Sequence, residues 1–488
     1  MEDKRLSRDP SPESPRTTST ASDGRSSTPG HFKPWPGPRV NPSPLRPQIL
    51  NTRPFRKKTT MKCTLPHPDS SPKIVCMGGG TGLPQLLRGL KKLSRSTHNR
   101  IDMAKITAIV TAFDDGGSSG RIIQDYEMLP PGDLRRCLIA LADEQSEPLL
   151  VRFLEHRFDD KEHDHLAGHS VGNLLLLALT QIHGGDFRKA LLSVTKLLSL
   201  QSTILFPTLS PATLCARLSD GHIIRGESHI AQRRGHASIA SIFLEHRDDA
   251  ATRAFEPMDG VLEAIDTADL ISLGPGSLFT SVLPHFLVDG IVDALNRTSA
   301  RRVYICNLMT EVGETDNFSV GDHLRHLNRM GVNVDAVIVN NRPLPPPIAL
   351  AYEEERCRLS YQKTLRRLDH AFNLALHDRS QTNELEKTIA ESAQRLSRLT
   401  HRMAHPEHNI LQVLVREEED IPEHVAVIQR DLLAEEEIMG DEGRPKTVIR
   451  HDPEKLARCL VELGEGIRAD LGRNIPPPHP GPRGIHRS

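Results

Sequence analysis

A cluster of four glycines within five residues follows a short apolar segment of this 488-residue chain. The apolar segment is Ile74–Met77, the glycine-rich turn is Gly78–Gly82, and residues 83–90 continue with the apolar spacing of a helix. This order predicts a buried strand, a turn of bare backbone and a helix N-terminus. Exposed amides and the positive end of the helix dipole favour a bound phosphate or other anion, although such a turn can also be purely architectural.

The turn matches neither of the two common phosphate-binding patterns. A dinucleotide-binding G-x-G-x-x-G that starts at Gly78 would need glycine in place of Leu83. No lysine followed by serine or threonine comes after the turn, as it would in a P-loop. The ligand therefore has to be inferred from the rest of the chain.

Downstream of the turn, apolar strand-like runs alternate with helical patterns. This alternation predicts a mostly parallel sheet that is covered by helices on both faces. Four of the runs end in glycine-rich or polar segments, after residues 77, 112, 273 and 306. Because ligands of doubly wound sheets bind outside the carboxyl ends of the strands, we expect these segments to form one site of nucleotide size.

The segment after the second strand carries polar groups suited to such a ligand. Asp114 and Asp115 can accept hydroxyl hydrogens or hold a hydrated metal ion, and Ser118 and Ser119 offer hydroxyls. Arg121 can donate two hydrogen bonds to a phosphate. The alternative interpretation is a surface turn that is held by its own aspartate side chains.

Two further turns carry hydroxyls or a familiar motif. Gly274–Ser281 is a second strand-to-glycine turn and thus a second candidate anion site. Gly168–Asn173 spells the G-x-S-x-G of a hydrolase elbow, but no strand precedes it, so we interpret Ser170 as the cap of a helix. That helix is apolar on all sides over Leu174–Leu179 and is expected to be fully buried. Asp133, after Pro130 and Pro131, is expected to cap another helix.

Two insertions interrupt the α/β alternation. Asp220-Gly221 between two strand-like runs predicts a β-hairpin. Residues 356–407 have helical periodicity that breaks at residues 377–383, which predicts a helical hairpin. The helical hairpin either packs against the body of the protein or offers a surface to a partner or a second copy.

Composition limits what the ends of the chain can do. Residues 1–72 hold 14 of the 36 prolines and 13 lysines and arginines against 6 acidic residues. Such a segment buries too little apolar surface to fold, so we expect a disordered tail rather than a nucleic-acid-binding arm, and likewise for residues 475–488. Seven cysteines are scattered singly along the chain, which is typical of a protein in the reducing cytoplasm. The N-terminus lacks the apolar stretch of a signal peptide. The densest apolar run, Leu174–Leu179, is too short to span a membrane.

Seven motifs together carry a family likeness, and they follow one another in this order: Gly78–Gly82, Asp114–Arg121, Pro130–Asp133, Gly168–Asn173, Leu273–Ser277, Cys306–Thr310 and Gly313–Asp316. They resemble the bacterial gluconeogenesis factor family (YvcK-like), whose superfamily also contains CofD, the 2-phospho-L-lactate transferase of deazaflavin coenzyme synthesis. The resemblance covers residues 73–341 and resumes near residues 448–452. Two positions depart from the family pattern, since Arg136 replaces a usual Asn and Phe279 a usual Tyr.

The resemblance implies a Rossmann-like three-layer α/β/α fold. Residues 73–349 would form the nucleotide-sugar-binding domain, residues 350–407 a helical insertion, and residues 408–474 the part that completes the domain. The family likeness further implies a cytoplasmic regulator that binds a UDP-sugar such as UDP-N-acetylglucosamine, uses no cofactor, and supports growth and cell shape or cell-wall maintenance on gluconeogenic carbon. A homodimer, or a protein partner at the helical insertion, is compatible with this role.

The resemblance and the polar groups at the strand ends together give the expected residues of the site. Those expected to contact the nucleotide and its sugar are Gly78, Gly79, Gly80, Thr81, Gly82, Asp114, Asp115, Ser118, Ser119, Arg121, His169, Asn173, Gly274, Gly276, Ser277, Asn307, Thr310 and Arg450. The alternative function is a CofD-like transfer of a phospho-lactyl group from a nucleotide diphosphate to a deazaflavin. In that case Asp114 and Asp115 would hold Mg²⁺ against the phosphate charge.

Overall fold

The computed structural model describes residues 71–96, 101–142, 148–158, 165–233, 237–247, 254–377, 382–404, 412–415, 421–439 and 445–471. Apart from residues 71 and 72, the predicted tail at residues 1–72 lies outside these ranges, as does the tail at residues 475–488.

A seven-stranded parallel sheet forms the centre of the fold, with the strand order β10-β9-β8-β7-β1-β2-β3. Its strands are β1 (Ile74–Gly78), β2 (Ile106–Val110), β3 (Thr203–Leu205), β7 (Leu270–Leu273), β8 (Arg301–Ile305), β9 (Ala336–Asn340) and β10 (Ala426–Arg430). The order runs outward from β1 through β3 in one direction and from β7 through β10 in the other. The direction therefore reverses between β1 and β7, and the crevice at such a point is where doubly wound sheets bind ligands.

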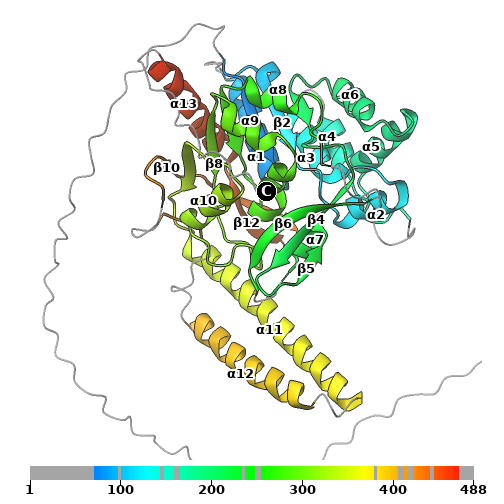
Figure 1. The fold of residues 1–488 in the computed structure, drawn as a ribbon, viewed down its shortest axis with the longest axis vertical. Helices are drawn as coiled ribbons and strands as arrows, with labels where there is room; N and C mark the ends of the chain where they lie inside the picture. Colours follow the sequence, from blue (N-terminus) through cyan, green and yellow to red (C-terminus); the bar gives the residue numbers. More distant parts are fainter. Residues whose placement is uncertain are drawn as a thin grey trace, which may run out of the picture. The chain divides into compact units, whose positions relative to one another are not determined.

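Helices flank this sheet on both faces, which confirms the predicted three-layer α/β class (Figure 1). The larger ones are α1 (Gly82–Ser94), α2 (Gly117–Tyr126), α3 (Pro131–Leu141), α4 (Pro148–Glu155), α5 (Val171–Ile182), α6 (Phe187–Leu197), α10 (Val320–Arg329) and α13 (Pro453–Leu471). The shorter ones are α7 (Glu227–Ala231), α8 (Val261–Asp266), α9 (Ile291–Arg297), and the turns η2 (Met103–Lys105), η3 (Leu278–Val282) and η4 (Leu283–Leu287). Because helices cover both faces, strands β1, β7 and β9 are buried along their whole length.

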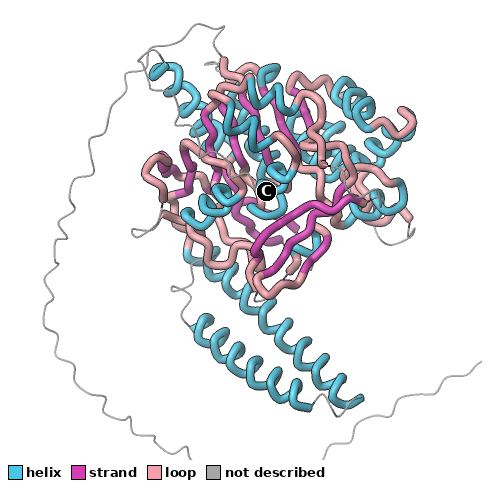
Figure 2. The backbone as a smooth tube through the Cα atoms, viewed as in Figure 1, coloured by secondary structure: helices cyan, strands magenta, loops and turns pink. Residues whose placement is uncertain are grey.

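The predicted β-hairpin is present and is larger than expected. Strands β4 (Ala212–Leu218) and β5 (Ile223–Arg225) pair around Asp220-Gly221, and β6 (Ile239–His246) adds a third antiparallel strand. Figure 2 shows this small sheet apart from the parallel strands. A further antiparallel pair joins β11 (Leu433–Met439) to β12 (Pro445–His451).

The helical insertion is a hairpin, as its periodicity predicts. Helix α11 (Pro346–His377) and helix α12 (Thr382–Ala404) lie side by side (Figure 1). Helix α11 begins earlier than expected, and its first turns contact the body of the fold, where the Tyr352 hydroxyl accepts a hydrogen bond from the Ile449 amide at 2.8 Å.

Two local predictions for helix ends have different outcomes. Ser170 caps α5 and accepts a hydrogen bond from the Asn173 amide at 3.3 Å, as expected. Asp133, however, is not a cap, because Pro130 occupies that position in α3. The expectation of a fully buried α5 is also wrong, since Ala178 is exposed and Leu174 is only half-buried. Helix α5 therefore lies at the surface of the domain, with one side exposed to solvent.

No single helix in the described ranges is long and apolar enough to cross a membrane. The bent pair formed by Leu278–Leu287 and Ile291–Arg297 has sufficient length and apolar content, but Leu278 and Ile291 are fully buried in the core.

Candidate functional site

The two glycine-rich turns that the sequence predicts lie against each other at the ends of β1 and β7. A Cβ atom on Gly82 would lie 2.6 Å from the carbonyl carbon and oxygen of Pro275, and one on Gly276 would lie 3.2 Å from the Gly79 oxygen. Side chains at these positions would force the turns apart, so their close approach requires glycine. Where the strand order reverses, the two turns Gly78–Gly82 and Gly274–Ser277 therefore form one continuous backbone surface, which we call the glycine wall.

This wall borders a cavity of about 560 Å³. The cavity is lined by residues from both turns, from helices α1, α7 and α11, from the segment after β8, and from β12. They are Gly80, Thr81, Gly82, Gln85, Glu227, Ala231, Pro275, Gly276, Ser277, Thr280, Ser281, Asn307, Leu308, Met309, Glu311, Val312, Glu314, Tyr352, Ile449, Arg450 and His451. Seven of the predicted site residues are among them: Gly80, Thr81, Gly82, Gly276, Ser277, Asn307 and Arg450.

The helix that starts at this wall has an open N-terminus. The side chain of Thr81, the N-cap residue of α1, makes no capping hydrogen bond, and no acidic residue lies in the first turn. The first amides and the helix dipole therefore face the cavity without a competing carboxylate in the helix itself, which is the arrangement that binds phosphate groups.

Asp133 and Arg136 hydrogen-bond to the backbone of the first glycine turn. The Gly80 amide donates a hydrogen bond to Asp133 Oδ2 at 2.8 Å, while Arg136 Nε donates to the Gly80 oxygen at 3.1 Å. Arg136 also pairs with Asp133 and lies 3.9 Å from Asp114 Oδ2. The sequence suggested only a helix cap for Asp133, because nothing local to residues 130–136 indicates contact with residue 80.

Three glutamates line the cavity and are not among the predicted site residues, although Glu314 belongs to the Gly313–Asp316 motif. Burial and the charges of Asp114 and Asp133 raise the pKa of Glu227 to about 8. Burial raises the pKa of Glu311 to about 7, and burial together with the Glu311 charge raises the pKa of Glu314 to about 8. The Ser277 hydroxyl donates to Glu314 Oε2 at 2.6 Å. Carboxyl groups that retain protons near neutral pH can both donate and accept hydrogen bonds.

Two further lining residues carry buried polar atoms without partners among the described residues. Asn307 Oδ1 and His451 Nε2 are buried and have no hydrogen-bond partner among the described residues. Burial lowers the pKa of His451 to about 4, so its ring is neutral. Arg450 is about one-third exposed and lies 3.9 Å from Glu436 Oε2. Thr310 is buried and does not line the cavity.

Asp114 and Asp115, which follow β2, do not line the cavity and hydrogen-bond to different partners. Asp114 Oδ2 accepts from the Ser119 hydroxyl at 3.1 Å, and burial raises the pKa of Asp114. Asp115 Oδ1 accepts from the Ser228 amide at 2.8 Å. Within the described residues, no group of three or more His, Cys, Asp or Glu side chains could hold a metal ion. This geometry gives no support to a metal shared by the two aspartates.

The remaining predicted residues of this region form a buried hydrogen-bonded cluster. The Ser118 hydroxyl lies 3.0 Å from His169 Nδ1 and accepts from Asn173 Nδ2 at 3.0 Å. Asn173 Oδ1 in turn accepts from Arg135 Nε at 3.1 Å, and Arg121 donates to the Ala167 oxygen. The cluster joins α2, α3 and α5, and none of its members lines the cavity.

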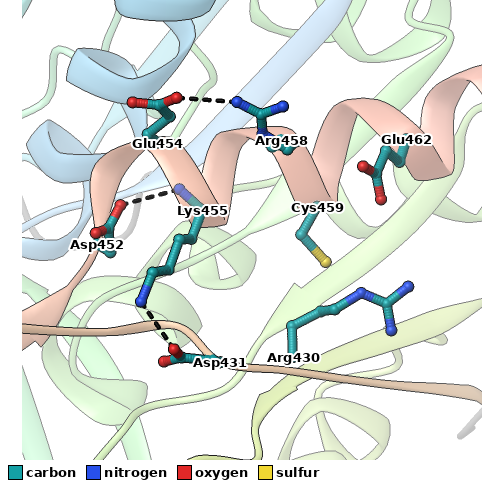
Figure 3. Close-up of a pocket in the computed structure, with 8 residues that line it drawn as sticks. All are labelled: Arg430, Asp431, Asp452, Glu454, Lys455, Arg458, Cys459 and Glu462. Carbon is teal, nitrogen blue, oxygen red and sulfur yellow. Dashed lines mark hydrogen bonds and ion pairs between the residues drawn. The ribbon is translucent and has the colours of Figure 1, made fainter.

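A second hollow, of about 430 Å³, lies between the end of β10 and α13 (Figure 3). Four of its charged groups already pair with one another, Lys455 Nζ with Asp431 Oδ2 at 2.9 Å and Arg458 Nη2 with Glu454 Oε1 at 2.9 Å. Burial raises the pKa of the Cys459 thiol to about 11, so the thiol stays protonated. The open helix N-terminus and the unpaired polar atoms belong to the larger cavity, which is therefore the candidate site.

Comparisons with known proteins agree with this architecture. The family model described as 2-phospho-L-lactate transferase CofD matches residues 74–374. The chain is 42% identical over 285 residues to a protein named gluconeogenesis factor from Halalkalibacterium halodurans. The matched region covers 58% of this chain and 82% of the relative. It is 42% identical over 289 residues to the gluconeogenesis factor of Bacillus subtilis, with 59% of this chain and 84% of the relative covered.

A solved structure has the same fold. The crystal structure of a UPF0052-family protein from Bacillus halodurans superposes with a TM-score of 0.59 at 32% sequence identity, and covers 80% of this chain and 99% of that protein.

Proposed function

Because the chain belongs to the gluconeogenesis factor family within the CofD superfamily, we propose that it is a cytoplasmic regulatory protein that binds a UDP-sugar. Membership in this family supports a gluconeogenesis-related function. We further propose that the bound nucleotide sugar, with UDP-N-acetylglucosamine as the first candidate, couples carbon supply to growth and to cell-shape or cell-wall maintenance.

The observation that carries the ligand proposal is the cavity at the reversal of strand order. Its volume of about 560 Å³ lies within the range of small-molecule sites. The open N-terminus of α1 suits the diphosphate, and Arg450, which also lines the cavity, supplies a cation that can approach the same group. The proton-bearing glutamates suit hydroxyl groups of a ribose or sugar, which both donate and accept hydrogen bonds.

Isothermal titration calorimetry of the full chain tests this proposal. We expect saturable binding of UDP-N-acetylglucosamine, with weaker binding of UDP, which lacks the sugar, and of GDP, which carries another base. Chromatography of the recovered nucleotide sugar should return it unchanged after long incubation. A protein that is folded by circular dichroism yet shows no heat of binding with any of the three would refute the nucleotide-sugar proposal.

The second candidate function is a CofD-like transferase, which the family match over residues 74–374 favours. Mg²⁺ at such a site would neutralise phosphate charge during transfer. Asp114 and Asp115 hydrogen-bond to different partners, and this arrangement does not fit a metal ion held between them. Incubation with a deazaflavin, a phospho-lactyl nucleotide and Mg²⁺ distinguishes the two functions, because only a transferase would form a phospho-lactyl deazaflavin detectable by mass spectrometry.

A further inference from the structure

Helix α11 carries an apolar stripe that the described structure leaves uncovered. Tyr361, Leu365, Phe372 and Leu376 are 49%, 44%, 53% and 65% exposed, and Leu368 between them is half-buried. At about 100° per residue all five fall within about 80° of the helix circumference and extend over about 22 Å. We call these five residues the α11 stripe. Single exposed apolar residues are common, but an aligned row with two aromatic rings is typical of an interaction surface.

The stripe is distinct from the face that α11 turns to α12. Arg367 Nη2 donates to Glu391 at 2.7 Å and Arg395 Nη2 donates to the Ser360 hydroxyl at 2.9 Å, so residues 360 and 367 mark the face that contacts α12. Thr364, between them, is 2% exposed. The centre of this face lies about 110° around the helix from the centre of the stripe. Helix α12 therefore covers one face of α11, and none of the described residues covers the neighbouring face that carries the stripe.

The spacing of the stripe is symmetric. Its outer residues follow one another at intervals of four, seven and four positions, with the centre between Leu368 and Asp369. When a second α11 is laid antiparallel over this centre, Leu365 of one copy lies opposite Phe372 of the other, and Tyr361 lies opposite Leu376. Each contact thus joins an aromatic ring to a leucine, and the two Leu368 side chains meet at the axis. A two-fold interface requires this kind of self-complementarity, whereas an unrelated partner does not.

The polar residues beside the stripe agree with the same pairing. Asp369 and Arg366 lie on one flank of the stripe, and a two-fold axis turns this flank towards its own copy. The antiparallel register leaves Asp369 of one copy about 3 Å along the helix axis from Arg366 of the other. Opposite charges therefore face each other twice across the interface.

From this symmetry we infer that the protein forms a homodimer through the α11 stripe, with the two α11 helices packed antiparallel against each other. The inference is independent of the proposed ligand, because the stripe shares no residue with the lining of the cavity.

Light scattering after size-exclusion chromatography tests the dimer in the full chain. We expect a mass of twice the 54.2 kDa of one chain. The double variant Leu365→Glu with Phe372→Glu should raise the dimer dissociation constant by about tenfold or more, because charges replace apolar contacts. Leu374→Glu is the matched control, since Leu374 is 47% exposed on the same helix but points about 160° away from the stripe. A monomeric wild-type protein, or a double variant that stays dimeric at every dilution, would overturn the inference.

Disulfide cross-linking tests the antiparallel register. A mixture of Leu365→Cys and Phe372→Cys chains should form a cross-linked pair under mild oxidation. Leu365→Cys alone should not form one, because its two copies would lie about 10 Å apart along the axis, beyond the reach of a disulfide. Self-cross-linking of Leu365→Cys at the same rate as the mixture would contradict the antiparallel arrangement. Equal far-ultraviolet circular dichroism of all variants verifies that the helices remain folded.

Discussion

Replacement of Gly82 by alanine tests the central feature of the site, which is the close contact between the two glycine turns. The new methyl group would lie 2.6 Å from two backbone atoms of Pro275 and 2.8 Å from the Gly276 amide. Ordinary carbon contacts begin near 3.4 Å, so one turn has to shift by about 0.8 Å. Neither neighbour is the end of a flexible side chain, and the strain therefore falls on the paired ends of β1 and β7.

The expected cost follows from two opposing contributions. Overpacking of a well-packed region costs about 1–3 kcal/mol, and contact with backbone belongs at the upper end of that range. Alanine recovers up to about 1 kcal/mol relative to glycine within a helix, and Gly82 is the first residue of α1. We therefore expect a net loss of about 2 kcal/mol in the free energy of unfolding.

Urea unfolding measures this loss, and calorimetry measures the consequence for the ligand. We expect a lower urea midpoint and at least about tenfold weaker binding of UDP-N-acetylglucosamine, because the displaced turns line the cavity. Gly464→Ala is the control, since the Cβ of this helical residue would meet side chains rather than backbone, namely the end of Leu270 at 3.2 Å and Pro72 Cγ at 4.0 Å. Unchanged midpoint and affinity in Gly82→Ala would show that the two turns are not in contact, and would refute the composite wall.

Three further substitutions test separate parts of the structure. Arg450→Ala should weaken UDP-sugar binding about 10- to 100-fold by calorimetry, as expected for the loss of a charge-assisted hydrogen bond. The free energy of unfolding should change by less than about 1 kcal/mol. Arg458→Ala is the control, and equal affinities of the two variants would remove Arg450 from the site. Burial raises the pKa of Glu314 to about 8, above its value in the unfolded chain, so its contribution to stability is present at low pH and is lost as the pH rises through about 8. Glu314→Gln should therefore gain stability relative to wild type between pH 5.5 and 8.5 in urea unfolding, with the exposed Glu462→Gln as the control; a pH-independent difference between Glu314→Gln and wild type would contradict the raised pKa. Gly89→Ala should lower the free energy of unfolding by about 2–3 kcal/mol, because its methyl group would overlap the Pro453 oxygen of α13, and an unchanged thermal midpoint would exclude this packing of α13 on α1.

The parts of the fold that depend on neighbours in sequence were predictable. The strand and glycine turn at residues 74–82, the hairpin at Asp220-Gly221 and the Ser170 cap each depend on residues within a few positions of one another. The short strand β3 and the third hairpin strand β6 were missed. β3 has only three residues, and in β6 half-buried residues dilute the period of two on which strand prediction relies.

The lining of the site was only partly predictable. Glycines at strand ends indicated the wall, since the turn and its chemistry lie in one segment. The glutamates were not predicted as site residues, although Glu314 lies in the Gly313–Asp316 motif. Glu227 comes from a β insertion, and Glu314 acquires its raised pKa only when the fold buries it beside Glu311. Conversely, Asp115 and Ser118 looked like ligand-binding residues from their local sequence, yet their side chains hold other parts of the chain together.

The sequence alone determined the nature of the first turn: a buried strand, a bare backbone and an open helix N-terminus follow from the order of residues 74–90. It could not determine what faces that turn. The contact with the second turn joins residues 82 and 275, and the Gly80 amide meets a carboxylate 53 residues away. Contacts over such distances depend on strand order and packing, which only the tertiary structure decides.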